Sequence, residues 1–516
     1  MTTKFDLIQR GFFPQELPPP FTTITLANNL NSISMENTAT SKCITYDIPR
    51  VKLQRRHLAI PNPLHQIKLS QAIETNWSNL QAHFDKSKLS ISRPISSEKR
   101  AVETSRTFGD LVSERILRSP DKRIVLKTDI SRYYPTIYTH SLPWALHTKA
   151  LAKVNRQDNY YGNLLDRHMR NCQDGQTIGI PIGPDTSLII SEIIGSEIDS
   201  LLQTSIPNIQ GVRYIDDYFL YFDTIAEAEK AHSVFHQILR EFELDHNSEK
   251  TSINPLPENL LKEWVFDLQS SKVRFKSIAQ KNDIISYFSK AFDYIYKYPE
   301  DFVLKYALER SKTFSVTHDN WSLYESLILK SMIVEPNTLQ VSLEILLSYQ
   351  SYGYILDREK IAQTLKKIIL HHSSFSHCYE VSWALWICQS LKIDLKSEVS
   401  HAISQMTNSI VILLALDLQS KGYISGINID ELDYYLKQNS IFEDQWLLTY
   451  ESQIKGWLSG EGFDRSEFFI SLQDHNVTFY DDKRQVETFI PKEIESVLEQ
   501  IDQHEIMNNV TSLSLY

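Results

Sequence analysis

Apolar and β-prone residues in the first half of the chain predict a small sheet. A buried strand is predicted over residues 124–126, running into Asp129. Two further β-prone runs flank Asp216 and Asp217 and predict a hairpin with both carboxylates at its tip. Helical spacing of apolar residues predicts helices at 141–153, 190–201 and 226–242. A last β-prone run predicts a strand near 250–253. This order predicts an α/β sheet with helices on one face.

The pattern becomes helical after about residue 285. Helices are predicted at 284–296, 321–333, 339–349, 361–371 and 380–391. Such a succession is typical of stacked helix pairs, so we expect an all-α helical-repeat (HEAT-like) domain over 286–516. Residues 1–45, rich in Thr, Asn, Ser and Pro, are predicted to form an irregular arm, which leaves 46–285 as the mixed part.

Composition fits a soluble protein with more than one domain, because the chain has 516 residues, 42% apolar and 23% charged. The net charge of −11 is unevenly distributed. Residues 1–128 hold 19 Lys and Arg against 11 Asp and Glu, a net of +8; taking these from the totals of 53 and 64 leaves 34 and 53 for residues 129–516, a net of −19. A basic first quarter of the chain favours contact with anionic ligands there.

Neither a membrane span nor a secretory signal is visible in the sequence. The apolar runs are far shorter than the roughly 20 residues that cross a bilayer. Four cysteines have neither CxxC pairing nor zinc spacing, which favours free thiols in a reducing compartment. We therefore expect a cytoplasmic protein that does not associate with a membrane.

The candidate chemistry centres on carboxylates at predicted strand ends. Asp129 and Asp216 can hold two Mg²⁺ ions about 4 Å apart, one activating an attacking hydroxyl and the other stabilising a leaving pyrophosphate. Asp217 is expected beside this cluster, and Lys250 can serve as general acid or as charge partner of the pyrophosphate. The alternative is that the Asp pair only forms a turn and that Lys250 is a surface residue.

Further residues are candidates for nucleotide binding. Tyr134, five residues after Asp129, can lie under the sugar and exclude a 2′-hydroxyl, or it is simply a core aromatic. The Gly179-Ile-Pro181-Ile-Gly183 turn opens a helix, where a backbone approaches phosphate closely, although a capped turn has the same pattern. A basic set upstream can clamp phosphates: Arg55, Arg56, Lys99, Arg100 and Arg106.

The order of these features resembles the fingers and palm of reverse transcriptases. Three segments, Asp129–Trp144, Gly179–Ser187 and Tyr379–Trp386, resemble the abortive-infection group of bacterial reverse transcriptases. The resemblance covers about residues 45–260 with clear motifs and the helical part more loosely. It implies an α+β fold, with right-hand polymerase fingers and palm followed by the all-α helical-repeat domain in place of a thumb.

The resemblance also implies a function. Proteins of this group defend bacteria against phage, and some polymerise deoxynucleoside triphosphates without a template, priming from a protein hydroxyl. The single-stranded DNA product then stays covalently attached, and several members form closed homo-oligomers, here expected as a trimer or hexamer. The metals would be Mg²⁺, with Mn²⁺ as an alternative, on Asp129, Asp216 and the Ile130 backbone. Three tyrosines are candidate primers: Tyr46, Tyr138 and Tyr516.

Two departures from the general reverse transcriptase pattern bear on template use. Ile182 stands where a glutamine is usual, and Glu192 where an asparagine is usual. Isoleucine offers no hydrogen-bonding side chain to a template or base, which favours untemplated synthesis. Two alternatives remain: an RNA-templated enzyme working with a dedicated non-coding RNA, and a catalytically inactive polymerase-fold scaffold. Retention of Asp129, Asp216, Asp217 and Lys250 argues against the scaffold, because clustered carboxylates repel one another without metal.

Overall fold

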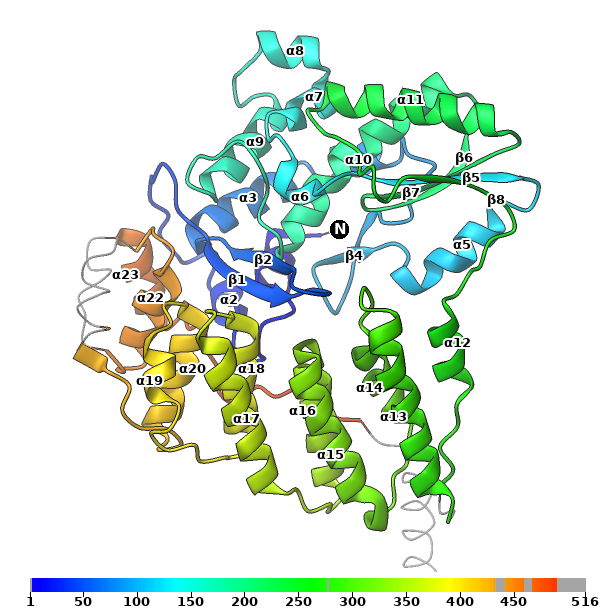
Figure 1. Cartoon of the computed structure of the whole chain (residues 1–516). Helices are drawn as coiled ribbons and strands as arrows, with labels where there is room; N and C mark the ends of the chain where they lie inside the picture. The colour runs from blue at the N-terminus through cyan, green and yellow to red at the C-terminus, as the bar shows by residue number, and fades with distance from the viewer. Residues whose placement is uncertain (1, 276–277, 431, 433–440, 459–465, 490–516) are drawn as a thin grey trace, which may run out of the picture. The chain divides into compact units, whose positions relative to one another are not determined.

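The computed structural model describes residues 2–275, 278–430, 432, 441–458 and 466–489, and Figure 1 draws its helices and strands. The chain forms two compact units. Of the described residues, unit 1 takes those within Met1–Tyr46, His57–Leu260 and Ile429–Asp482, and unit 2 takes those within Asp47–Arg56, Leu261–Asn428 and Lys483–Tyr516. Both units are therefore built from segments distant in sequence, unlike the consecutive domains predicted at 46–285 and 286–516.

Unit 1 contains a four-stranded sheet of order β6-β7-β5-β8. Its strands are β5 (Ile124–Asp129), β6 (Gln210–Tyr214), β7 (Asp217–Phe222) and β8 (Ser252–Pro255). Every neighbouring pair is antiparallel. The predicted strand at 124–126 and the predicted hairpin around Asp216 are confirmed, and the strand predicted near 250–253 lies at 252–255.

Side chains alternate between the two faces of the sheet along each strand, and the two faces pack against different groups of residues. On one face Leu126 and Leu220 lie opposite each other and belong to the large core built with α10 (Asp185–Ser205) and α11 (Ile225–Glu241). The other face carries Val125 and Tyr221, which pack with residues of a smaller cluster. Asp129 and Asp217 follow the same alternation and lie on this second face.

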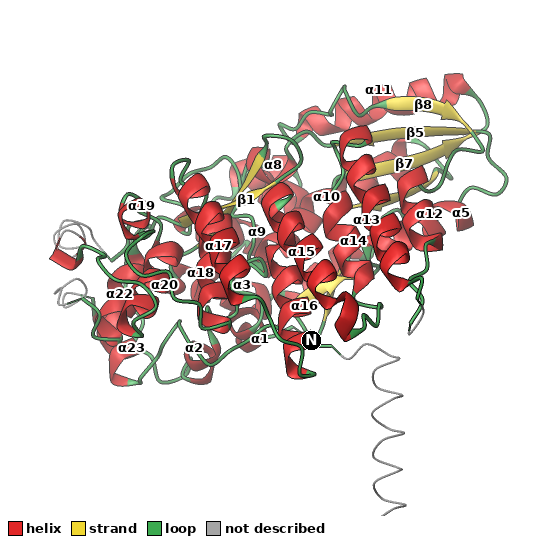
Figure 2. Cartoon of the chain, turned by 60° about the horizontal axis from the view of Figure 1, so that its bottom comes forward, coloured by secondary structure: helices red, strands yellow, loops and turns green. Residues whose placement is uncertain are grey.

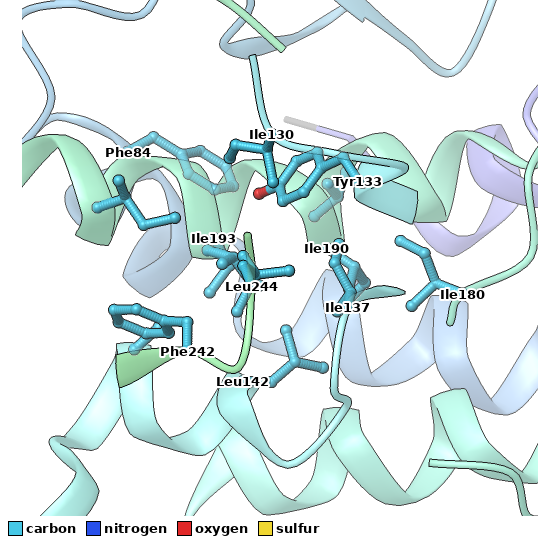
Figure 3. Close-up of a cluster of buried hydrophobic side chains, with 14 of the residues drawn as sticks. Phe84, Ile130, Tyr133, Ile137, Leu142, Ile180, Ile190, Ile193, Phe242 and Leu244 are labelled. Carbon is cyan, nitrogen blue, oxygen red and sulfur yellow. The ribbon is translucent and has the colours of Figure 1, made fainter. Parts of the chain in front are cut away.

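The large core joins the sheet to the surrounding helices of unit 1 (Figure 3). Ile130, Tyr133 and Ile137 enter it directly after β5, and Ile190 and Ile193 enter it from α10. Further helices of this unit are α3 (Pro63–Thr75), α4 (Trp77–Phe84), α5 (Leu111–Leu117), α6 (Tyr133–Thr136), α7 (Ser141–His147), α8 (Lys149–Val154) and α9 (Tyr161–Asn171). Short strands β3 (Pro94–Ser96) and β4 (Val102–Thr104) form a separate antiparallel pair.

The segment predicted as an irregular arm is packed into unit 1. It contains α1 (Lys4–Gln9) and α2 (Ile24–Asn28), and Leu7, Ile8 and Phe12 are fully buried. Phe12 stacks on Trp446 of α22 (Trp446–Ile454) with ring centroids 6.5 Å apart. The local Pro- and Thr-rich composition did not indicate these contacts, because their partners lie more than four hundred residues away.

The helix predicted over 141–153 is interrupted. Thr148, with φ 71°, separates α7 from α8, because an L-residue at positive φ cannot continue a right-handed helix. Periodicity alone did not reveal the break, since apolar residues continue on both sides of it.

Unit 2 is predominantly helical, as Figure 2 illustrates. Its helices are α12 (Glu263–Ser270), α13 (Gln280–Lys297), α14 (Val303–Ser311), α15 (His318–Val334), α16 (Leu339–Ser351), α17 (Arg358–Ser373), α18 (Cys378–Ser390), α19 (Ser400–Ser404) and α20 (Ser409–Ser420). All five helices predicted from periodicity are confirmed. Neighbours in sequence pack together, including α13 on α14 and α17 on α18. The HEAT-like repeat remains a prediction.

A hairpin of β1 (Ile44–Pro49) and β2 (Arg55–Ile60) contributes its tip, Asp47–Arg56, to unit 2. The last helices, α22 and α23 (Glu467–Asp474), belong to unit 1. The chain therefore passes between the two units more than once.

Candidate active site

Three carboxylates gather at one end of the two central strands. Asp129 is the last residue of β5, lies opposite Asp217 at the start of β7, and is 3% exposed. Asp216 occupies the turn between β6 and β7, where its carbonyl accepts the Ile130 N–H at 3.2 Å. The sheet register thus brings together residues that stand far apart in the sequence.

The turn lies one residue earlier than predicted. Tyr214 pairs with Asp217, so the two-residue loop is Ile215-Asp216 and Asp217 is already in the strand. Ile215 adopts φ 56°, a strained conformation for a β-branched residue. Strain of this kind persists only where surrounding contacts impose it.

Those contacts come from a buried charge network that sequence reasoning missed. Arg213 is fully buried; its Nε donates to Asp199 Oδ2 at 2.8 Å and its Nη2 to Glu192 Oε1 at 2.7 Å. The same guanidinium donates from Nη1 to the Ile215 carbonyl at 3.0 Å, and Ser92 Oγ accepts the Ile215 N–H at 2.8 Å. Arg213 is therefore a positioning residue for the turn that presents Asp216.

A sequence signal for this network exists on α10. Glu192, Gly195 and Asp199 stand at i, i+3 and i+7, which places two acidic residues and a glycine on one face of this largely buried helix. A Cβ at Gly195 would lie 2.7 Å from Arg213 Nη1, so the glycine makes room for the guanidinium. The departure at Glu192 thus has a structural explanation.

The pKa of Asp217 is shifted by its surroundings in this site. Burial raises the pKa of Asp217 to about 7, and the nearby charges of Asp216 and Asp129 add to this while Lys250 opposes it. Lys250 Nζ donates to Asp129 Oδ2 at 2.5 Å. Burial lowers the pKa of Lys250, but the hydrogen bond and charge of Asp129 outweigh burial and raise it, so the ammonium stays charged.

The site fits a hard divalent cation. Asp129 Oδ1 is buried and has no hydrogen-bond partner among the described residues. A buried carboxylate oxygen without a donor, beside two more carboxylates, is the all-oxygen environment that Mg²⁺ and Mn²⁺ prefer. Asp129, Asp216 and Asp217 would hold such ions.

The loop that carries Lys250 is fastened to β5 by backbone hydrogen bonds. The Asn247 N–H donates to the Asp129 carbonyl at 2.9 Å, and the Ser131 N–H donates to the Asp245 carbonyl at 2.8 Å. His246 forms an antiparallel bridge with Ile130. Position and orientation of Lys250 therefore depend on residues 245–247.

The structure places Tyr134 beside the glycine turn. The Ile180 N–H donates to the Tyr134 carbonyl at 3.0 Å and the Gly179 N–H to the Ile137 carbonyl at 2.8 Å. Tyr134 is half-buried, and its Oη accepts a hydrogen bond from Ser191 Oγ of α10 at 3.1 Å. Tyr133, by contrast, is a core residue that donates to the Ser191 carbonyl at 2.7 Å.

Protein atoms, rather than open space, surround the two glycines. A Cβ at Gly179 would meet the Pro135 carbonyl oxygen at 3.1 Å, and one at Gly183 would meet Pro14 Cγ at 2.5 Å. Both have positive φ, and Pro181 between them is buried. The glycines are thus required by close packing and backbone conformation, which explains them without a ligand.

Of the basic residues predicted to bind phosphate, some are exposed and others are bonded to groups of the protein itself. Lys99 is exposed. Arg100 Nη1 donates to the Phe13 carbonyl at 2.9 Å, and its Nε donates to Asp185 Oδ1 at 3.0 Å, so its guanidinium is bound within the protein. In unit 2, Arg55 donates to both carboxylate oxygens of Glu380. Lys99 therefore offers the more accessible charge of the two candidates, Lys99 and Arg100.

The candidate priming tyrosines differ in exposure. Tyr46 is fully buried. Tyr138 is half-buried and packs edge-on against Trp144, with centroids 5.6 Å apart. Tyr516 lies outside the described residues.

Comparisons with known proteins bear on the central part of the chain. Residues 61–278 match the family model described as "Reverse transcriptase (RNA-dependent DNA polymerase)". A search of curated proteins finds no match to this chain. Among solved structures, the chain is similar to apo telomerase from Candida tropicalis, with 11% identity, a TM-score of 0.32, and coverage of 75% of this chain and 68% of that one.

Membrane insertion through a helix has no support in the described part of the chain. None of its helices combines the length and the apolar character needed to span a bilayer.

Proposed function

From the reverse transcriptase match over residues 61–278, we propose that the protein is a DNA polymerase acting on deoxynucleoside triphosphates at Asp129, Asp216 and Asp217. The observation that carries this proposal is the convergence of the three carboxylates with Lys250 at one end of the central strands. One oxygen of this cluster, Asp129 Oδ1, is buried and accepts no hydrogen bond from the described residues. Two divalent ions, when bound, would supply Lewis-acid activation of the attacking hydroxyl and charge neutralisation at the leaving pyrophosphate.

Lys250 is best suited to stabilise negative charge on a bound substrate. Its pKa is raised beside Asp129, so the ammonium is a weak proton donor near neutral pH. A fixed cation at this edge stabilises the charge that develops on the departing pyrophosphate. Of the two roles expected for Lys250, charge partner is therefore favoured over general acid.

Synthesis without a conventional template is part of the proposal. Ile182 offers only its backbone, and its carbonyl already accepts the Ala59 N–H at 2.8 Å. No side-chain hydrogen bond from this position is available to a template base. The alternative, copying a dedicated non-coding RNA, has support from the net charge of +8 over residues 1–128.

The biological role proposed here is antiphage defence by abortive infection in the bacterial cytoplasm. It rests on the resemblance of Asp129–Trp144, Gly179–Ser187 and Tyr379–Trp386 to that group of reverse transcriptases. Protein priming, covalent attachment of the DNA and a closed trimer or hexamer belong to the same proposal and rest on the same resemblance.

The test uses full-length protein freed of nucleic acid, Mg²⁺ and labelled deoxynucleotides. Products are separated on denaturing gels before and after protease treatment, with and without added RNA. The proposal predicts label that migrates with the protein and shifts on proteolysis, without RNA. Label that requires added RNA would replace untemplated synthesis by the RNA-templated alternative. Absence of label under every condition would contradict the polymerase assignment.

Sugar selection by Tyr134 is a separate prediction. If its ring lies under the sugar of the incoming nucleotide, Tyr134→Ala should admit ribonucleotides, raising their use relative to deoxynucleotides by about tenfold or more. Tyr133→Phe is the matched control, because Tyr133 is buried and donates only to the Ser191 carbonyl. Unchanged discrimination in Tyr134→Ala, measured by paired incorporation assays, would exclude Tyr134 as the selecting residue.

A further inference from the structure

A group of metal-ligating side chains lies behind the Lys250 loop. His232 and His236 stand four residues apart on α11, so they project from one side of the helix. The His246 ring packs edge-on against both, with centroids 4.8 Å from His232 and 5.0 Å from His236. Asp245, next to His246, completes the group.

The distances in this group suit a metal ion. Asp245 Oδ1 lies 3.7 Å from His236 Nε2 and 3.3 Å from His246 Nδ1, and all three ligand atoms lie within 4.8 Å of one another. Ligands of tetrahedral zinc, each about 2.0–2.1 Å from the ion, stand about 3.4 Å apart. Small side-chain rotations would therefore bring the three atoms around one ion.

Two imidazole nitrogens in the group make no hydrogen bond with the described residues, although His246 Nδ1 lies 3.3 Å from Asp245 Oδ1. They are His232 Nε2 and His246 Nδ1, and both are buried. A buried polar atom without a hydrogen-bond partner is energetically costly.

We propose that His236, Asp245 and His246, with His232 beside them, bind a divalent transition-metal ion of the zinc class. The imidazole-rich ligand set favours zinc, cobalt or nickel over magnesium or calcium, which prefer oxygen ligands. A helical pair of histidines four residues apart is a common half of such a site. This proposal does not depend on the polymerase activity.

The consequence of binding follows from the backbone connections of the loop. The Asp245 carbonyl accepts the Ser131 N–H, and the Asn247 N–H donates to the Asp129 carbonyl, which places His246 opposite Ile130. An ion that joins Asp245 and His246 to α11 fastens this loop to the helix. The bound ion therefore holds in place the segment that presents Lys250 to Asp129.

A second group, His372, His377 and Glu380 in unit 2, is less suited to a cation. Both oxygens of Glu380 accept hydrogen bonds from the Arg55 guanidinium, at 2.7 Å each. The two histidine Nδ1 atoms lie 3.0 Å apart and form a hydrogen bond with each other. A metal ion there would face a fixed positive charge in a buried setting, which is unfavourable.

The test is Co²⁺ binding by full-length protein first stripped with a chelator, in buffer with millimolar Mg²⁺ to occupy oxygen-only sites. We expect visible absorption bands of nitrogen-coordinated cobalt, removal of these bands by Zn²⁺, and a rise in the unfolding temperature on adding Zn²⁺. Replacing a ligand in His236→Ala or His246→Ala should weaken binding by about tenfold or more and abolish the thermal shift.

Matched variants make the outcome decisive. His401→Ala removes an exposed helical histidine outside both groups and should bind Co²⁺ as wild type does. His236→Gln tests the same ligand with a more conservative side chain and should also lose binding. The proposal is overturned if wild-type protein gives no cobalt bands, or if binding survives in both His236 variants and is lost instead in His377→Ala.

Discussion

Asp217 links the stability of the metal-free protein to pH. Its pKa is raised to about 7 by burial and by Asp216 and Asp129. A carboxyl whose pKa is higher when folded contributes stability below its unfolded pKa, and this is lost as pH rises through the folded value. With a chelator present, the free energy of unfolding should therefore fall between about pH 4 and pH 7.

Chemical denaturation across this pH range measures the effect. Asp217→Asn should flatten the decline, whereas Asp293→Asn, which removes an exposed carboxylate on α13, should leave it as in wild type. Added Mg²⁺ should stabilise wild type more at pH 8 than at pH 6, because the ion requires the ionised carboxylate. Parallel profiles for wild type and Asp217→Asn would contradict the ionisation argued for this site.

The buried Arg213 network is predicted to stabilise the fold. In Arg213→Met the buried Glu192 and Asp199 lose their shared cation, which should cost about 3–5 kcal/mol of unfolding free energy. Arg167→Met removes a surface cation paired with Asp158, each 45% exposed, and should cost at most about 1 kcal/mol. Equal losses in the two variants, measured by denaturant titration, would show that the buried network does not stabilise the fold.

The same residues show which parts of the site could be predicted from the sequence and which could not. Asp129 and Asp216 were found because strand patterns end at them and carboxylates at strand ends have a known chemistry. Arg213 was missed because a single arginine inside a strand gives no periodic signal, and its partners come from a helix packed on the sheet. Strand register, rather than local sequence, also determines that Asp217 faces Asp129.

Among the elements, the glycine turn before α10 has the tightest local requirements. Gly183 has φ 131° and a Cβ there would contact Pro14, whereas Gly353 has φ 83° and open space around it. An alanine at positive φ costs about 1 kcal/mol, and forcing apart packed atoms adds about 1–3 kcal/mol. Gly183→Ala should thus destabilise the protein clearly more than Gly353→Ala.

Thermal and denaturant unfolding of the two variants tests this difference. Similar losses would mean that the Pro14 contact is easily relieved and that the turn is not held by the N-terminal segment. The sequence indicated the turn through its Gly and Pro residues, but not that contact. The helix break at Thr148 escaped prediction for a related reason, since nothing in the local pattern requires a positive φ there.

For the whole molecule, the division into units depends on contacts between distant segments. Phe12 meets Trp446, and the Thr22 N–H donates to the Phe479 carbonyl at 3.0 Å, so segments more than four hundred residues apart in the sequence both contribute to unit 1. Composition predicted a separate arm and consecutive domains, because it reports only local tendencies. The helices themselves were predictable, since each has its own amphipathic period.

Nucleotidyl transfer is proposed to use divalent ions held by the three carboxylates. The most direct test of this proposal is Mg²⁺-dependent incorporation of labelled deoxynucleotides by full-length wild type, Asp216→Asn and Asp223→Asn, each shown to be folded by circular dichroism. Asp223, an exposed carboxylate just after β7 that pairs with Lys122, serves as the control. We predict incorporation by wild type and Asp223→Asn that stops when Mg²⁺ is chelated, and only background in Asp216→Asn. Incorporation by folded Asp216→Asn at the wild-type rate would contradict the account.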